Sequence, residues 1–140
     1  MVLDLSSLKE AMSSLEKAIN VTCPEKKMDG LDNDQKDTLR AGVIQNFEFT
    51  YELCWKFMKR WLENNMGSVY VDGVPRRELF RLAAEHQLIE NIDQWMVYHD
   101  ERNETAHTYD KNKAQEVFEA AKSFLKDAKI CLKNLESRND

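Results

Sequence analysis

The sequence has little of what an all-β fold, a secreted scaffold or a membrane protein requires. Its 140 residues include only 4 glycines and 2 prolines, too few for the many turns of a sandwich or barrel. It has no run of about 18 apolar residues, so we expect no membrane span. The N-terminal segment carries acidic residues in a helical pattern, unlike a signal peptide. Its three cysteines, Cys23, Cys54 and Cys131, are an odd, widely spaced set, which predicts reduced thiols in a cytoplasmic protein.

The overall composition indicates a folded chain. Apolar residues make up 42% and charged residues 32%, a profile typical of a globular protein rather than a disordered one. The length predicts one domain, residues 1–140. The net charge of −5 argues against a protein that coats nucleic acid, although a local basic cleft is compatible with it.

Two long amphipathic segments open the chain. Ser7-x-x-Glu10 resembles a capping box and predicts the start of a first helix, which Pro24 ends. The acidic cluster from Asp32 to Asp37 predicts the start of a second helix, which runs to Asn65 with Gly67 as its stop. The predicted buried face of this second helix comprises Leu39, Val43, Phe47, Tyr51, Cys54, Met58 and Leu62. It would be a rod of about 45 Å, whose surplus apolar surface predicts a two-fold dimer.

Three further helices are expected in the second half. Residues 67–75 are interpreted as a loop, and Pro75 suits the first turn of a short helix that reaches about His86. Asn91-x-x-Gln94 and Asn112-x-x-Gln115 predict the starts of the fourth and fifth helices. The fifth carries a seam of apolar residues spaced three and four apart, from Ala114 to Leu135. The sequence therefore predicts an all-α protein, an up-and-down bundle of about five helices.

The segment HDERNETAHTYD, residues 99–110, places polar residues at the end of a core-facing stripe. Seven residues return a helix to within about 20° of the same direction. Arg102 therefore shares the direction of Trp95, and Asn103 that of Met96, so both are expected to face other helices or a cleft. If the fourth helix ends near Ala106, the residues that follow it lie in the connecting turn.

The chemistry of this segment suits RNA cleavage without a metal. The guanidinium of Arg102 matches phosphate oxygens bidentately and stabilises developing charge. The imidazole of His107 exchanges protons near neutral pH, and Asn103 is a candidate to orient either group. In the structural alternative, Arg102 pairs with Glu101, Glu104 or Asp110, and His107 is an ordinary turn histidine.

Two stretches resemble a known family. RNETAHTY is similar to the R-x4-H-x-Y signature of the HEPN superfamily, with the usual polar residue after the arginine. The segment QNFEFTYELCWKFMK, residues 45–59, together with Trp95, resembles one branch, the nucleotidyltransferase substrate-binding proteins of HepT type. The resemblance covers essentially the whole chain.

This resemblance implies a helical, dimeric protein that needs no cofactor or metal, and two classes of function. In one, the chain is a metal-independent endoribonuclease toxin with Arg102, Asn103 and His107 as catalytic residues, controlled by a minimal nucleotidyltransferase antitoxin. In the other, it is a non-catalytic subunit that presents substrate to that nucleotidyltransferase. The tyrosine of the motif, here Tyr109, is implied to accept AMP groups from the partner.

Three further features of the sequence suggest other sites. Glu104-x-x-His107 matches half of a di-iron site, but no second Glu-x-x-His occurs in the sequence. Cys54, at an apolar helical position, is predicted to be a core residue rather than a nucleophile. Two basic clusters are candidates for RNA binding, or else ordinary solvated faces: Lys56, Lys59 and Arg60 on the second helix, and Arg76, Arg77 and Arg81 on the third.

Overall fold

The computed structural model describes residues 2–139, and the two terminal residues of the predicted 1–140 domain lie outside it. Five α-helices follow one another: α1 (Ser6–Thr22), α2 (Asn33–Met66), α3 (Arg76–Glu85), α4 (Ile92–Glu104) and α5 (Lys111–Ser137). Short 3-10 turns lie between them: η1 (Glu25–Met28), η2 (Ser68–Tyr70) and η3 (Thr105–His107). Residues 2–139 contain no strand, which confirms the all-α prediction.

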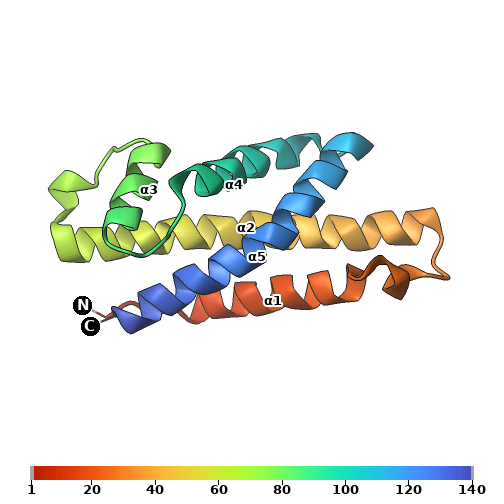
Figure 1. Cartoon of the computed structure of the whole chain (residues 1–140), viewed down its shortest axis with the longest axis horizontal. Helices are drawn as coiled ribbons and strands as arrows, with labels where there is room; N and C mark the ends of the chain where they lie inside the picture. The colour runs from red at the N-terminus through yellow and green to blue at the C-terminus, as the bar shows by residue number, and fades with distance from the viewer. Residues whose placement is uncertain (1, 140) are drawn as a thin grey trace.

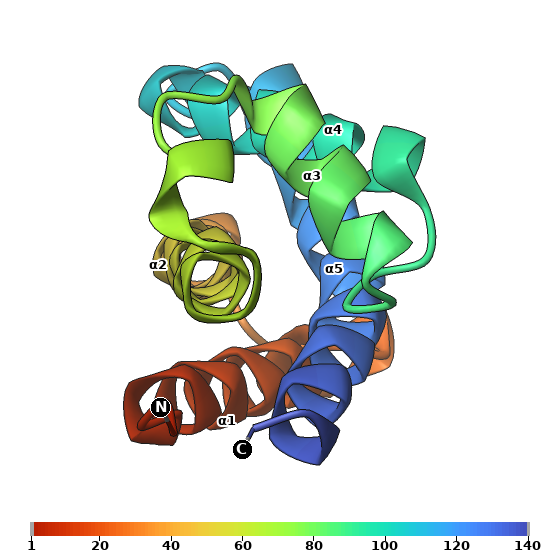
Figure 2. The same ribbon diagram turned by 90° about the vertical axis from the view of Figure 1, so that its left-hand side faces the viewer.

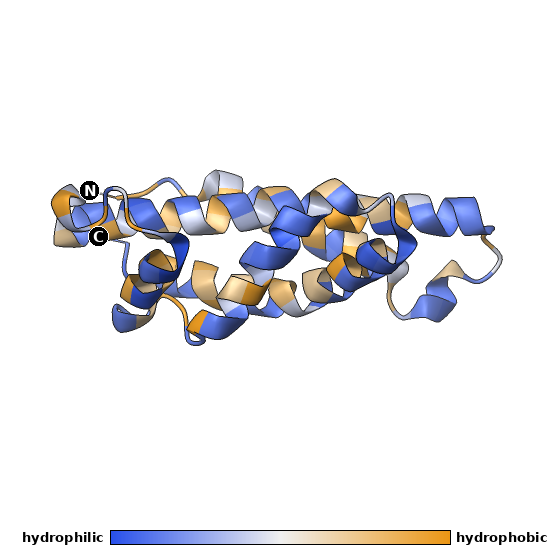
Figure 3. Ribbon diagram, turned by 90° about the horizontal axis from the view of Figure 1, so that it is seen from above, coloured by the Kyte–Doolittle hydropathy of each residue, from blue (hydrophilic) through white to orange (hydrophobic). Residues whose placement is uncertain are grey.

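The long helices form a bundle in which α2 and α5 each contact α1, α4 and one another (Figure 1). Helix α3 lies across one end, against α4 and the last part of α2 (Figure 2). Hydrophobic and hydrophilic residues alternate along each long helix (Figure 3), as expected where one side faces a core. The two ends of the chain lie together, since the Asn139 amide bonds the backbone N–H and C=O of Leu3. Within residues 2–139, no helix combines the length and the apolarity needed to cross a membrane.

An aromatic cluster joins the three helices that carry the candidate site. The fully buried ring of Phe124 on α5 lies edge-on to Phe47 and Tyr51 of α2 and to Trp95 and Tyr98 of α4, with centroid distances of 5.1–6.2 Å. Edge-to-face packing of this kind stabilises aromatic pairs beyond simple burial. It also fixes how α4 sits on α2, and so which α2 side chains meet the end of α4.

The helix starts differ from two of the predicted caps. Helix α2 begins with Asp32 and Gln35 in a reciprocal capping box, and Asn91 caps α4 as predicted. The Ser7 and Asn112 caps are wrong. Helix α1 starts at Ser6, bonded through its N–H to Asp4, and Asp110 caps α5 by accepting from the N–H groups of Asn112 and Lys113. In both places an upstream aspartate carboxylate accepts bonds from the exposed N–H groups of the first turn.

Candidate functional site

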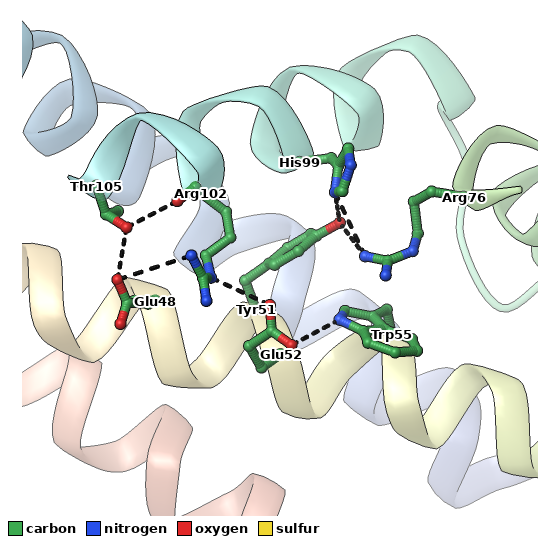
Figure 4. A network of polar contacts seen from close by, with 8 residues as sticks. All are labelled: Glu48, Tyr51, Glu52, Trp55, Arg76, His99, Arg102 and Thr105. Carbon is green, nitrogen blue, oxygen red and sulfur yellow. Dashed lines mark hydrogen bonds and ion pairs between the residues drawn. The ribbon is translucent and has the colours of Figure 1, made fainter. Parts of the chain in front are cut away.

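Arg102 is half-buried at the end of α4 and is held by α2 (Figure 4). Its Nε donates to Oε1 of Glu52 at 3.1 Å, and its Nη1 lies 3.9 Å from Oε2 of Glu48. The prediction that Arg102 faces another helix is confirmed, while the alternative pairing with Glu101, Glu104 or Asp110 is wrong.

Within residues 2–139, Nη2 of this guanidinium has no hydrogen-bond partner. The carboxylate of Glu52 is itself fixed, because its Oε2 accepts from the indole N–H of Trp55 at 3.1 Å. The hydroxyl of Thr105, just after α4, donates to Glu48 at 2.5 Å. Carboxylates anchored in this way hold the arginine in one orientation, with Nη2 available for an anion.

A second arginine joins the network from α3 (Figure 4). The guanidinium carbon of Arg76 lies 3.8 Å above the Trp55 ring, a close cation–π contact. Its Nη1 donates to the hydroxyl of Tyr51 at 2.9 Å, and that hydroxyl lies 2.9 Å from Nδ1 of His99. The tyrosine oxygen accepts from arginine, so its own proton is free to go to Nδ1, which leaves the histidine proton on Nε2.

Burial and the charge of Arg76 keep Tyr51 and His99 in their neutral forms. Burial, and then the charge of Arg76, lower the pKa of His99 below its ordinary value of 6.5. Burial raises the pKa of Tyr51 despite the adjacent arginine. At neutral pH, Tyr51 and His99 therefore act as neutral hydrogen-bonding groups beside Arg76.

The other motif residues lie on the surface. His107 is exposed in η3 and touches Tyr109 edge-on, with ring centroids 6.2 Å apart. Tyr109 is 85% exposed. Asn103 is also exposed, so the expectation that it shares the inward direction is wrong: Met96, one heptad earlier, is itself only half-buried and marks the edge of the buried stripe.

The two basic clusters have different surroundings. On α3, Arg77 pairs with Asp93 at 3.0 Å, and Arg81 pairs with Glu78 and Glu85, so local acids balance both. Arg76 alone of the three joins the network. On α2, the ammonium of Lys56 lies 5.8 Å from the centre of the Trp55 ring. Lys59 is half-buried, and exposed Arg60 lies over Phe57. Lys56 from one cluster and Arg76 from the other thus both lie against Trp55, one helical turn beyond Glu52.

Glu101, the residue before Arg102, has the carboxyl group of Glu116 on α5 as a neighbour. Burial first, and then the neighbouring carboxylate of Glu116 on α5, raise the pKa of Glu101 from 4.5 to about 7. Its Oε2 is buried and accepts no hydrogen bond within residues 2–139. Lys113 opposes this rise in pKa and Glu104 adds to it.

The sequence reasoning missed Glu48, Glu52, Tyr51 and His99. A signal was present, because Glu48 and Glu52 directly follow the buried Phe47 and Tyr51, and acids at the edge of a buried stripe need partners. His99 precedes Arg102 by three residues, which places both on one side of α4. Cys54 is fully buried, which confirms it as a core residue.

The fold and the motif define a class of protein: a helical bundle in which R-x4-H-x-Y runs from the last turn of the fourth helix into the turn before the fifth. A family described as nucleotidyltransferase substrate binding protein like matches residues 3–137. The chain therefore belongs to this family, which confirms the resemblance inferred from the sequence.

Individual relatives are similar to this chain over most of their length. The chain is 36% identical to a Haemophilus influenzae protein named probable ribonuclease HepT, over 98% of this chain and 94% of the relative. A solved structure from the same species, described as the fold of a substrate-binding domain of a nucleotidyltransferase, superposes with a TM-score of 0.91 at 34% identity, covering 95% of this chain and 99% of that one. A Thermus thermophilus structure shares the fold, with a TM-score of 0.73 at 23% identity over 91% and 98% of the two chains.

Proposed function

We propose that this single-domain protein is a metal-independent endoribonuclease of toxin type, controlled by a partner minimal nucleotidyltransferase. The observation that carries the proposal is the fixed, half-buried Arg102, whose Nη2 edge is left free by Glu52. The proposal is supported by the 36% identity to a protein named probable ribonuclease.

The proposed reaction is an internal transfer within RNA. The 2′-oxygen attacks the adjacent phosphorus while the bond to the 5′-oxygen breaks, giving a cyclic phosphate and a 5′-hydroxyl. His107 performs one of the two proton transfers, taking the proton of the 2′-hydroxyl or giving one to the leaving 5′-oxygen, and water performs the other. Arg102 stabilises the charge that builds on the phosphate oxygens. Asn103, exposed beside them, contacts the substrate rather than orienting Arg102, and Arg76 and Lys56 contact neighbouring phosphates.

The second candidate function is a non-catalytic substrate-binding subunit of a two-component nucleotidyltransferase. It is favoured by the description of the structural relative as a substrate-binding domain. It is also compatible with the two carboxylates beside Arg102, which reduce the net positive charge offered to RNA.

Cleavage of RNA in EDTA separates the two functions. We expect the purified chain, free of its partner, to cut single-stranded RNA, and Arg102→Ala and His107→Ala to lose at least 100-fold in rate with unchanged circular dichroism. Arg77→Ala, which removes an exposed arginine paired with Asp93, is the control and should cut normally. Absence of cutting by the unmutated chain supports the substrate-binding subunit, and equal cutting by all variants places the chemistry elsewhere.

Regulation and assembly complete the proposal. The exposed Tyr109 is the acceptor of AMP from the partner, and the added phosphate competes with RNA for Arg102. Intact mass after incubation with the partner and ATP should increase for the unmutated chain but not for Tyr109→Phe. We also propose a homodimer, which light scattering at micromolar concentration tests directly.

A further inference from the structure

A cavity of about 320 Å³ opens beside Tyr109, where the start of α5 faces the N-terminal half of α2. In Figure 1 this is the region between the first turns of α5 and the orange part of α2. Tyr109 stands at its rim, and Ile44, Ala114 and Gln115 contribute to its wall. Its size is at the lower end of the roughly 300–1,000 Å³ of small-molecule sites, which suits a ligand as small as a mononucleotide.

Arg40 lines this cavity with hydrogen-bonding capacity to spare. Only 24% of its side chain is exposed, and its ion pairs are long: 3.3 Å to Glu25 and 3.9 Å to Asp37, two largely exposed acids. Its Nε is buried and has no acceptor within residues 2–139. The distant pair with Asp37 leaves the guanidinium able to take an anion in the cavity as a closer partner.

Lys111 adds a second positive charge at the same cavity. It is the first residue of α5, where the helix dipole is positive, and the first turn of this helix contains no acid. The carboxylate of the N-cap residue Asp110 offsets part of this positive field, but it is bonded to the N–H groups of Asn112 and Lys113. Lys113 in the same turn pairs with Glu104 and Glu116, whereas Lys111 has no ion pair within the described residues.

We propose that this cavity binds a nucleoside monophosphate. The phosphate lies between Arg40 and Lys111 and displaces Asp37, the weaker and more distant partner of Arg40. The base packs on the apolar wall formed by Ile44 and Ala114. The proposal rests on the proposed function for the source of the ligand, namely the AMP attached to Tyr109.

Because the nucleotide is attached to Tyr109, a cavity that binds free AMP only weakly is enough to hold it. A group tethered by a few bonds has an effective concentration in the millimolar range, so a site that binds free AMP with a Kd of about 1 mM is substantially occupied once the nucleotide is attached. The docked nucleotide then fixes the turn that carries His107, two residues before Tyr109. A docked nucleotide therefore silences by immobilising this turn, whereas an undocked one competes with RNA at Arg102.

Titration of the unmodified, full-length chain with AMP tests the site without any transfer reaction. We expect 1H–15N shifts at the amides of Ile44, Ala114 and Gln115, with a Kd of about 1 mM and a much weaker response to adenosine, which lacks the phosphate. Arg40→Gln should weaken AMP at least ten-fold. Lys111→Gln, at an exposed position that leaves the fold intact, should weaken it about three-fold. Lys133→Gln, exposed at the far end of α5, is the control.

Three outcomes overturn the proposal: no cavity shifts at 10 mM AMP, shifts confined to the Arg102 network, or equal binding by the Lys111 and Lys133 variants. Failure of the docking site and failure of the proposed modification can be told apart. Binding in the cavity without mass added at Tyr109 rejects the modification alone, while mass added at Tyr109 without binding in the cavity rejects the docking site alone.

Discussion

The carboxyl pair beside Arg102 predicts a specific dependence of stability on pH. The pKa of Glu101 rises from 4.5 to about 7 on folding, so between these values the folded state holds a proton that the unfolded state releases. The free energy of unfolding therefore decreases as the pH rises from 4.5 to 7, and the stabilising contribution is complete only below 4.5. The full change would correspond to about 3 kcal/mol, but Glu101 is only partly buried, and solvent screening reduces this to roughly 1 kcal/mol.

Glu101→Gln removes this dependence because an amide does not titrate. We expect the free energy of unfolding of the variant to exceed that of the unmutated chain by roughly 1 kcal/mol at pH 8 and to equal it at pH 4.5. Urea unfolding at both pH values measures the difference. Glu116→Gln should have a smaller effect, because it removes the neighbouring carboxylate but not the burial that is the larger cause of the shift. Added to Glu101→Gln it should change little, since the repulsion is already gone. Glu90→Gln, at an exposed position, is the matched control. A Glu101→Gln variant with the same pH profile as the unmutated chain would refute the reasoning.

Three other expectations address the network and its support. Phe124→Ala should lower the free energy of unfolding by about 3–5 kcal/mol in urea, because the ring is fully buried between three helices; a loss under 1 kcal/mol would contradict its central place. Glu52→Gln should cost less than about 1 kcal/mol of stability, since its ion pair is partly exposed, yet lower kcat for RNA cleavage by releasing Arg102; a change in KM alone would mean that Glu52 does not position the guanidinium. Nitrogen-15 NMR should find His99 neutral at pH 7 with its proton on Nε2, and a proton on Nδ1 would reverse the assigned direction of its bond with Tyr51.

Periodicity predicted the helices because each of them buries one side. Most of the expected face of α2, including Val43, Phe47 and Cys54, is fully buried, whereas Leu39 near its start is only half-buried. The ends of helices were harder to predict, since several neighbouring polar residues compete to cap each one. The N-cap of α5 is Asp110 rather than Asn112. Hydrophobic periodicity does not determine a difference of two residues at a helix end.

The partners of Arg102 depend on tertiary packing. The sequence indicated an inward arginine, but Glu52 lies 50 positions away on another helix, and its approach depends on how far α4 slides along α2. The position of α4 along α2 is set by the aromatic rings that pack around Phe124. This packing depends on the shapes of the side chains, which residue spacing in the sequence does not reveal. Arg76 was one of six basic candidates, and its contacts with Trp55 and Tyr51 distinguish it from Arg77 and Arg81, which pair with local acids.

The structure divides the motif into a fixed part and an exposed part. Arg102 is oriented before any ligand arrives, since Glu52 and Trp55 hold it, and so binding a phosphate there costs little side-chain entropy. His107 and Tyr109 share one short turn outside the bundle, with their rings in contact. Under the proposed function, a group attached to Tyr109 would therefore act on His107 first, through the turn and the adjoining cavity, and reach the arginine second. For the proposed enzyme, this order means that control acts mainly on the exposed half of the motif, while the arginine half stays assembled.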